Sequence, residues 1–412
     1  MMGNWKTCTI GDLGAVVGGA TPSTKKAENY DGGTISWITP KDLAGFSGRF
    51  ISHGERNITE QGLKSCSTQL MPAHTVLFSS RAPIGYIAIA EQEVCTNQGF
   101  KSVVPNEDTD YMFLYYLLKY NKDKIENLGS GTTFKEVSGS TMRGIEVSVP
   151  ETIEEQRQIA SVLSALDDKI EKNTEVNENL QAQVKALFHA MFISSADRFG
   201  WENGTFSDLI ESTLGGDWGK ESPTGNNTEM VYCIRGADIP EVKAGNKGKM
   251  PTRYILPKNY AAKRLLPGDI VVEISGGSPT QSTGRVAAIS QSLLDRYDKG
   301  MVCTNFCRAI KPKSGYSMFV YYYWQYLYDR NVFFSYENGT TGIKNLDLSG
   351  FVTTEEIVIP PFELIQKFDD YCQIVFDQTF ANGLENEQLS NLRDTLLPQL
   401  MSGELDVADL DL

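Results

Sequence analysis

Hydrophobic residues follow a heptad pattern in two stretches of this chain. From 151 to 199 no glycine or proline occurs, and apolar residues recur at alternating spacings of three and four. The same spacing returns after Pro361, where Gly383 weakens its middle. Each stretch predicts one long helix with a seam of inward-facing positions. The first seam comprises Ile159, Leu163, Leu166, Ile170, Asn173, Asn177, Leu180, Val184 and Leu187, and the second comprises Ile365, Phe368, Val375, Asn382, Asn386, Leu389 and Leu396.

The remaining residues form two blocks of mixed secondary structure. Short runs rich in Val and Ile, such as "SWIT", "TVLFSS", "YIAIA" and "FKSVVP", are bounded by Gly and Pro and predict strands. Each block also has one apolar, tyrosine-rich run, "YMFLYYLLKY" (111–120) or "SMFVYYYWQYL" (317–327). These runs predict amphipathic helices packed in a core.

The two blocks are copies of one another. "GSGTTFKEV" begins at Gly129, and "ENGTTGIKNL" begins at Glu337, 208 residues later. "VCTNQGFKSVVP" (94–105) matches "VCTNFCRAIKP" (302–312), and "TIGDL" matches "TFSDL". Seven such matches occur in order at a nearly constant offset, which is far too long for a solenoid repeat. The sequence predicts a duplicated domain, each copy followed by its own helix.

These elements predict an α+β fold with two tandem mixed α/β domains, residues 1–150 and 200–360, separated by two long helices. The central helix occupies 151–199 as a spacer, and the C-terminal helix, with an acidic tail, occupies 361–412. If an internal pseudo-two-fold axis relates the two copies, the long helices run in opposite directions and form an antiparallel coiled coil.

The antiparallel arrangement makes a prediction about four asparagines in the seams. With the helices in opposite directions, Asn173 faces Asn386 and Asn177 faces Asn382. A buried asparagine pair costs stability but fixes the register of two helices. The alternatives are a hydrated centre or a contact with a partner protein. A helix of about 38 residues would be roughly 57 Å long, enough to hold two domains apart.

The charge balance bears on the partners of the chain. Its 38 basic and 52 acidic residues give a net charge of −14 at pH 7, which argues against a simple nucleic-acid binder. The acidic excess belongs to the helical segments, so the two domains could still present a basic face. Seven cysteines without metal-site spacing indicate free thiols in a reducing compartment. Without a signal peptide or an apolar run of about 20 residues, we expect a cytoplasmic protein with no membrane span.

The usual catalytic constellations are missing from the sequence. Only three histidines occur, His53, His74 and His189, and they are too scattered for a triad or a metal site. The stretch "GGDWGKE" falls short of a phosphate loop because Glu221 stands where serine or threonine would hold magnesium. We therefore predict no catalytic residue, no metal site and no cofactor in this chain.

Several motifs resemble those of the specificity (S) subunits of type I restriction-modification systems. They are "PETIEEQRQIASVLSALDDKIE" after the first block, "GTTFKEV", "SSRAPIGYIAI", "TNQGFKS" and the terminal "LRDTLLPQLMSGELDV". The resemblance covers essentially the whole chain. The second half departs from the family pattern, because "PPFELIQKFDDYCQIVFD" lacks the usual Glu-Gln-x-x-Ile string and "SGGSPTQSTGR" replaces "SSRAPIG".

The resemblance implies a DNA-reading subunit without catalysis of its own. In this family two target-recognition domains are separated by two long helices, which bind two modification (M) subunits. Those subunits hold S-adenosylmethionine and methylate adenine, and restriction (R) subunits add a nuclease that uses ATP and Mg. The expected target is double-stranded DNA with a bipartite, gapped site. The site should be asymmetric, because the two copies share a frame but differ in their loops.

Residues with DNA-binding chemistry occur at turns and strand ends of both copies. Basic side chains there suit phosphate or guanine contacts, and Asn and Gln suit adenine edges. Paired threonines after a glycine offer hydroxyl and backbone donors to phosphate, although capping a helix or a turn explains the same residues. The candidates are Lys41, Arg81, Asn97, Gln98, Lys101, Thr132, Thr133 and Lys135 in the first block, and Arg235, Arg285, Asn305, Thr340, Thr341 and Lys344 in the second.

Two other interpretations are compatible with the sequence. The chain could be the recognition module of another type of restriction-modification system, which would differ only in its partners. It could instead be a coiled-coil adaptor that does not bind DNA, in which case no salt-dependent association with duplex DNA would occur.

Overall fold

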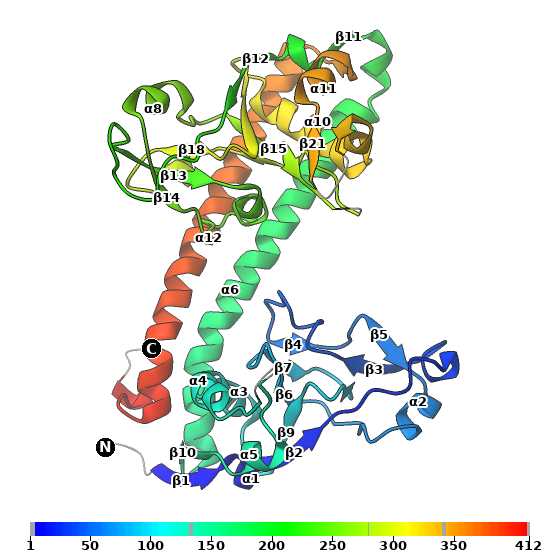
Figure 1. Ribbon diagram of the computed structural model, residues 1–412, viewed down its shortest axis with the longest axis vertical. Helices are drawn as coiled ribbons and strands as arrows, with labels where there is room; N and C mark the ends of the chain where they lie inside the picture. The colour runs from blue at the N-terminus through cyan, green and yellow to red at the C-terminus, as the bar shows by residue number, and fades with distance from the viewer. Residues whose placement is uncertain (1–4, 132–134, 279, 340–342, 410–412) are drawn as a thin grey trace. The chain divides into compact units, whose positions relative to one another are not determined.

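The computed structural model of the chain mixes helices and sheets and divides into two compact units (Figure 1). Unit 1 comprises residues 1–171 and 389–412, and unit 2 comprises residues 172–388. Each unit therefore contains one copy of the repeated domain and a part of each long helix. The structure describes residues 5–131, 135–278, 280–339 and 343–409.

Unit 1 is built on ten described strands. They are β1 (Trp5–Thr9), β2 (Gly14–Gly18), β3 (Ile35–Ile38), β4 (Phe50–Ile51), β5 (Arg56–Ile58), β6 (Val76–Phe78), β7 (Ile87–Ala90), β8 (Cys95–Thr96), β9 (Lys101–Pro105) and β10 (Glu146–Pro150). The main sheet has the order β2-β9-β6-β7-β4. A second sheet has the order β5-β3-β8, and β1 pairs with β10. The strands of these sheets are short, as the Val- and Ile-rich runs predict.

The helices of unit 1 cover these sheets and bury their apolar faces. They are α1 (Ile10–Leu13), α2 (Glu60–Lys64), α3 (Tyr111–Tyr120), α4 (Lys122–Asn127) and α5 (Gly139–Arg143). The tyrosine-rich helix α3 begins where Asp110 accepts a hydrogen bond from the backbone N–H of Phe113 at 2.9 Å. Its buried face, including Phe113, Leu114 and Leu117, packs in one core with Val76 and Ile89 of the main sheet.

Unit 2 contains twelve described strands. They are β11 (Glu202–Thr205), β12 (Ile210–Gly215), β13 (Glu229–Ile234), β14 (Thr252–Ile255), β15 (Ile270–Glu273), β16 (Ser275–Gly276), β17 (Val286–Ala288), β18 (Met301–Cys303), β19 (Cys307–Pro312), β20 (Glu337–Asn338), β21 (Lys344–Leu346) and β22 (Glu356–Ile359). They form sheets of order β12-β19-β15-β17, β14-β13-β18 and β16-β21-β20, and the pair β11-β22.

The core of unit 2 is rich in aromatic side chains. Its helices are α7 (Ile239–Lys243), α8 (Pro257–Lys263), α9 (Gln291–Leu294), α10 (Ser317–Asp329) and α11 (Leu348–Thr354). On α10, the ring of Trp324 lies 4.6 Å from that of Phe351 and 5.0 Å from that of Phe333, all three fully buried. Edge-on and tilted ring pairs of this kind add to the hydrophobic stabilisation of the core.

The internal repeat predicted from the sequence is present in the topology. Strand order β2-β9-β6-β7 in unit 1 matches β12-β19-β15-β17 in unit 2, and β5-β3-β8 matches β14-β13-β18. The central strand of the smaller sheet pairs in parallel with β8 in one copy and with β18 in the other. The matched Thr-x-x-Asp turns agree too, since Asp12 and Asp208 each accept from the backbone N–H of Thr9 or Thr205.

The two heptad stretches form the two longest helices. They are α6 (Ile153–Phe188) and α12 (Phe362–Ser402). Helix α6 stops short of residue 199 because a π-helical turn, His189–Ile193, follows it. This turn carries Phe192 into the aromatic core, where its ring lies 5.0 Å from that of Phe319. None of the helices in the described parts of the chain is long and apolar enough to cross a membrane.

Candidate nucleic-acid interface

Glu136, which follows the first Gly-Thr-Thr segment in the sequence, forms ion pairs with two basic side chains. Arg81 Nε lies 3.0 Å from Glu136 Oε2, and Lys101 Nζ lies 3.5 Å from Glu136 Oε1. Lys135, the preceding residue, is exposed. Arg81 and Lys101 share one carboxylate, so the group carries net positive charge even before Lys135 is counted. We call Arg81, Lys101, Lys135 and Glu136 the Glu136 cluster; its charge suits an anionic backbone.

The local backbone holds this cluster in place. Ser130 and Glu136 exchange two backbone hydrogen bonds of 3.0 and 2.9 Å, and the predicted Thr132 and Thr133 stand between them in the sequence. These two threonines lie outside the described residues, as do Thr340 and Thr341 of the second copy. Strand-like pairing thus fixes Ser130 and Glu136, and with Glu136 the cluster that it anchors.

Arg143 was not predicted from the sequence, yet it lies close to the Glu136 cluster. A Cβ added to Gly139 would be 3.6 Å from Arg143 Nη1 and 3.8 Å from Lys101 Cε. Arg143 is exposed in the last turn of α5, the short helix that follows the loop. The sequence signal for Arg143 was a basic residue in the last turn of a short helix. A basic residue at that position also interacts favourably with the helix dipole, so the signal did not single out DNA binding.

The other candidates of unit 1 make contacts inside the protein. Asn97 Oδ1 accepts from the backbone N–H of Gly99 at 2.8 Å, which is a turn cap. Gln98 accepts from the hydroxyl of Thr21. Lys41 pairs with Glu55 at 2.6 Å, where both side chains are exposed. The structure thus gives Asn97 and Gln98 local partners, and it pairs Lys41 with an acid other than Glu136.

The basic candidates of unit 2 are each matched by a carboxylate of their own. The shortest nitrogen–oxygen distances are 2.9 Å from Arg235 to Asp238, 2.7 Å from Arg285 to Glu273, and 2.7 Å from Lys344 to Glu337. All three carboxylates are almost completely buried. Arg285 binds Glu273 with both Nε and Nη2, so its planar fork is already occupied. Unlike the Glu136 cluster, these three pairs carry no net charge.

One exposed aromatic residue in unit 2 was missed by sequence reasoning. Phe306 is 61% exposed and follows the predicted Asn305, which is also exposed. It occupies the position that Gln98 occupies in the first copy, so alignment of the two copies was the signal that could have found it. A flat apolar ring at this place can stack on a nucleic-acid base, which glutamine cannot do as well.

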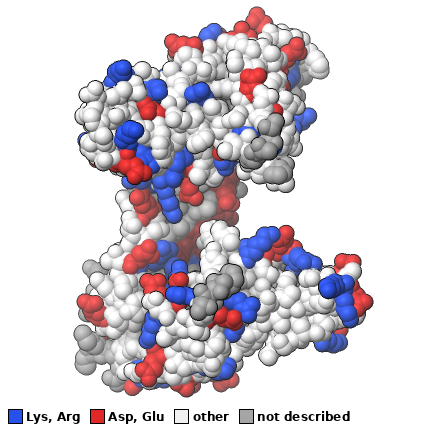
Figure 2. All heavy atoms as spheres, viewed as in Figure 1, with Lys and Arg blue, Asp and Glu red and all other residues white. Residues whose placement is uncertain are grey.

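Acidic and basic side chains are mixed over the visible face in Figure 2, where blue and red atoms are frequently adjacent. This distribution agrees with the many ion pairs within each unit. On this face positive charge is therefore interspersed with negative charge rather than gathered in one broad basic surface. The arrangement suits contacts at a few places on a DNA duplex.

The seam asparagines of the long helices contact one another within unit 2. Asn173 Nδ2 lies 2.9 Å from Asn386 Oδ1, and Asn382 Nδ2 lies 2.8 Å from Asn177 Oδ1. Because the numbers rise on one helix as they fall on the other, α6 and α12 run in opposite directions here. Three of the four asparagines are buried, and Asn386 is half-buried.

The apolar seam positions vary in their burial. In unit 1 Ile159 and Leu163 are buried, and in unit 2 Val184, Ile365, Phe368 and Val375 are buried. The remaining predicted positions are partly exposed: Leu166, Ile170, Leu180, Leu187, Leu389 and Leu396. Partial exposure at these positions means that the two helices alone do not enclose the whole seam in either unit.

A charged contact joins the two helices in unit 1. Asp167 on α6 accepts from Arg393 Nη1 at 2.6 Å and from the hydroxyl of Tyr116 at 2.7 Å. Burial first, and then the charge of Asp167, raise the pKa of Tyr116 far above its ordinary value, so this hydroxyl stays protonated and donates. The tyrosine-rich helix α3 is thereby tied to both long helices in unit 1.

The described residues show no grouping suited to a metal ion. Among them no three His, Cys, Asp or Glu side chains lie together in a way that could hold one. All seven cysteines are free thiols. Burial raises the pKa of Cys95, Cys233 and Cys303 to about 12 in each case, which keeps these three thiols protonated and unreactive at neutral pH.

Comparison with known proteins places this duplicated fold in a family. A family model described as "Type I restriction modification DNA specificity domain" matches residues 2–182. The specificity subunit of the type I restriction enzyme MjaIX from Methanocaldococcus jannaschii is 33% identical over 435 residues, covering 99% of this chain and 95% of that protein. This chain belongs to the family of type I restriction enzyme specificity subunits. The resemblance inferred from the motifs is confirmed.

Other specificity subunits are similar to this one over smaller spans. The HindI subunit of Haemophilus influenzae is 22% identical over 74% of this chain and 76% of its own length. The EcoR124I/EcoR124II subunit of Escherichia coli is 29% identical over 42% of each chain. The crystal structure of a type I S subunit from M. genitalium shares the fold, with a TM-score of 0.58 and 17% identity over 97% of this chain and 96% of that one.

Family membership settles the broad role of the chain. A type I specificity subunit is the non-catalytic part of its enzyme, and its role is DNA recognition. Such subunits carry no catalytic cofactor of their own. The internal repeat observed here agrees with the two target-recognition domains of the family.

Proposed function

We propose that this specificity subunit recognises a bipartite, gapped and asymmetric site in double-stranded DNA. The two recognition domains, residues 1–150 and 200–360, would each read one half-site. The observation that carries this proposal is the repeated strand order in two copies with different loop chemistry. Identical frames bind duplex DNA in the same manner, while different side chains on the frames select different bases.

The Glu136 cluster is the proposed contact of the first domain. Arg81, Lys101 and Lys135 would bind phosphate or guanine, with Thr132, Thr133, Asn97, Gln98 and Lys41 as further candidates. Arg81 and Lys101 share Glu136, so each could turn toward DNA without leaving that carboxylate unpaired. Net positive charge at a loop end also favours association at low salt.

Different chemistry supports the contact of the second domain. Exposed Asn305 and Phe306 would meet the bases, one by hydrogen bonds and the other by stacking. Arg235, Arg285 and Lys344 would support the loops, because each already holds a buried carboxylate. Thr340 and Thr341 remain candidates for phosphate. This difference between the copies supports an asymmetric target.

The long helices are the proposed scaffold of the complex. They would form an antiparallel coiled coil under an internal pseudo-two-fold axis, hold the two domains apart, and bind two M subunits in the cytoplasm. Opposite helix directions at the asparagine contacts support this. S-adenosylmethionine would belong to the M subunits, and ATP and Mg to R subunits bound in turn.

Selection of DNA from a random duplex pool tests this function. The chain with its modification subunits should enrich sequences with two unlike half-sites and an unselected gap between them. Binding to the enriched duplex should weaken steeply with salt, as phosphate contacts require. Enrichment of one continuous sequence would refute the proposal. The absence of salt-dependent binding would also refute it, and would favour the coiled-coil adaptor that does not bind DNA.

A further inference from the structure

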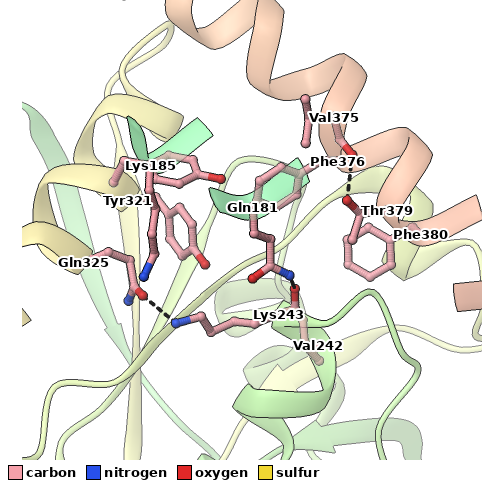
Figure 3. Close-up of a pocket in the computed structure, with 11 residues that line it drawn as sticks. Gln181, Lys185, Val242, Lys243, Tyr321, Gln325, Val375, Phe376, Thr379 and Phe380 are labelled. Carbon is pink, nitrogen blue, oxygen red and sulfur yellow. Dashed lines mark hydrogen bonds between the residues drawn. The ribbon is translucent and has the colours of Figure 1, made fainter. Parts of the chain in front are cut away.

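Three consecutive backbone carbonyls in unit 2 accept hydrogen bonds from two side chains of α6 and from Arg296. Gln181 Nε2 on α6 donates to the carbonyl of Lys243 (Figure 3), and Asn177 Nδ2 donates to that of Ala244 at 3.1 Å. Arg296 Nη1 donates to the carbonyl of Gly245 at 2.8 Å. We call the carbonyls of Lys243, Ala244 and Gly245, with these three donors, the carbonyl joint.

Two glycines let the backbone approach closely at the carbonyl joint. A Cβ added to Gly383 on α12 would lie 2.0 Å from the carbonyl oxygen of Gly245. A Cβ added to Gly245 would lie 2.4 Å from the carbonyl oxygen of Thr379, and Gly245 has a φ of +85°. Glycine is a poor helix former, so its place inside α12 is explained by this contact rather than by the helix itself.

The joint is continuous with the asparagine pair of the seam. Asn177 Nδ2 donates to the carbonyl of Thr379 at 3.0 Å as well as to Ala244, while its Oδ1 accepts from Asn382. Arg296 extends the network, because its Nη2 binds Glu387 Oε2 of α12 at 2.6 Å. A pair that only fixed helix register would need no bond to Ala244. Asn177 therefore connects α6, α12 and the end of α7.

The first domain attaches to its helix segment by other chemistry. Gly45 lies between β3 and β5 as Gly245 lies between the matching β13 and β14, and a Cβ added to Gly45 would have no atom within 4 Å. Instead Arg49, whose side chain is only 5% exposed, binds Glu171 of α6 at 2.9 Å and also binds Asp168. The first attachment is thus an ion-pair group, and the second consists of amide and guanidinium bonds to backbone carbonyls.

We propose that the carbonyl joint fixes the orientation of the second recognition domain on the long helices and thereby sets which gap length the protein accepts. The proposal rests on the proposed reading of a bipartite DNA site. Asn177, Gln181 and Gly383 are then positioning residues, which act through the domain they hold and touch no DNA. The acceptors are backbone carbonyls, which do not titrate, and the close approach of Gly383 to Gly245 restricts how that segment can shift on α12.

Gly383→Ala in the complete chain is the direct test, with hydrogen exchange as the first measurement. The added methyl group must displace Gly245, so amides of 239–248 should exchange about tenfold faster than in the wild type, while those of β2 and β9 do not change. Gln181→Ala should give a smaller change in the same segment and keeps the helix intact. Gln183→Ala, at an exposed position two residues away on α6, is the matched control. Unchanged exchange in 239–248 for both variants would overturn the joint.

Gap preference is the second measurement, made with the chain and its modification subunits. DNA with the selected gap is compared with DNA whose gap is longer or shorter by one base pair. A loosened joint should reduce the wild-type preference by about threefold or more, because freedom of one domain relaxes discrimination. Simple destabilisation lowers all affinities together and leaves the ratio unchanged, which would overturn the positioning role. A wild type without gap preference would refute the proposed function, whereas the exchange result would still test the joint.

Discussion

Asn382 donates a hydrogen bond of 2.8 Å to Oδ1 of Asn177, and both side chains are nearly inaccessible to solvent. The Oδ1 of Asn382 accepts in turn from Gln378 at 2.7 Å. Both polar atoms of the Asn177 side-chain amide are thus used, because Nδ2 donates to the carbonyls of Ala244 and Thr379 and Oδ1 accepts from Asn382. A satisfied buried network of this kind is costly to break at one point, because each loss leaves partners unpaired.

A double-mutant cycle tests the coupling of this pair. Asn177→Leu should lower the free energy of unfolding by about 2–4 kcal/mol, because it leaves the buried Nδ2 of Asn382 without its acceptor and the carbonyls of Ala244 and Thr379 without this donor. Asn177→Leu combined with Asn382→Leu should cost less than the sum of the two single changes. In the double variant neither asparagine is left without the other as its hydrogen-bond partner. Urea unfolding of the four proteins measures the coupling. Additive costs would show that the two amides do not interact.

Arg49 offers a second test, since its pair with Asp168 and Glu171 is buried on the arginine side. Burial would lower the pKa of Arg49, but hydrogen bonds to Glu171 and Asp168 outweigh it and raise the pKa. Arg49→Met should destabilise unit 1 by about 1–2 kcal/mol through the loss of charge-assisted hydrogen bonds. Lys41→Met, which breaks the exposed pair with Glu55, is the control and should leave the melting temperature unchanged. Equal effects of the two changes would contradict the assignment.

The contacts between the long helices could be predicted from the sequence, whereas the contacts of the loop residues could not. The two asparagine pairs follow from heptad spacing together with the opposite helix directions that a two-fold relation between the copies implies. Gly383 looked like a weak point of α12, whereas its role depends on Gly245, far away in the chain. Arg285 looked available for DNA, but the fold places Glu273 beside it on the neighbouring strand end. Such neighbours are set by strand register, which short Val- and Ile-rich runs do not specify.

Lys243 should make the stability of unit 2 depend on pH in the alkaline range. Burial, and then the charge of Lys185, lower the pKa of Lys243 to about 8 from its ordinary 10.5, while Asp329 opposes the shift and Arg285 adds to it. The unfolded chain binds the proton more tightly, so protonation penalises the folded state below about pH 8. Stability should rise by about 1–2 kcal/mol between pH 7.5 and 9.5 as this penalty disappears.

The control for this effect is Lys243→Met, which keeps the backbone carbonyl of the joint. Other groups titrate in the same range, so the informative quantity is the difference between wild type and variant. Urea unfolding at both pH values should show a smaller rise with pH in the variant. An identical pH dependence in the two proteins would mean that burying the protonated side chain of Lys243 does not destabilise the folded state.

Arg81 and Arg285 should differ in their importance for DNA binding. Arg81→Ala should weaken binding by about 1–3 kcal/mol if it contacts a base, or reduce the salt slope by about one if it contacts a phosphate. Arg285→Ala should act mainly on stability, because its guanidinium holds Glu273. Binding of the selected duplex over a range of salt concentrations separates these outcomes. Unchanged affinity and slope for Arg81→Ala would remove the Glu136 cluster from the interface.

The central claim, that two unlike copies of one domain read two separated half-sites, is tested most directly in a host cell. The chain is expressed there with its modification subunits, and every methylated adenine in the genome is mapped by sequencing. The account predicts one motif made of two different short sequences around a gap of unread bases. A continuous motif, or two identical half-sites, would contradict it.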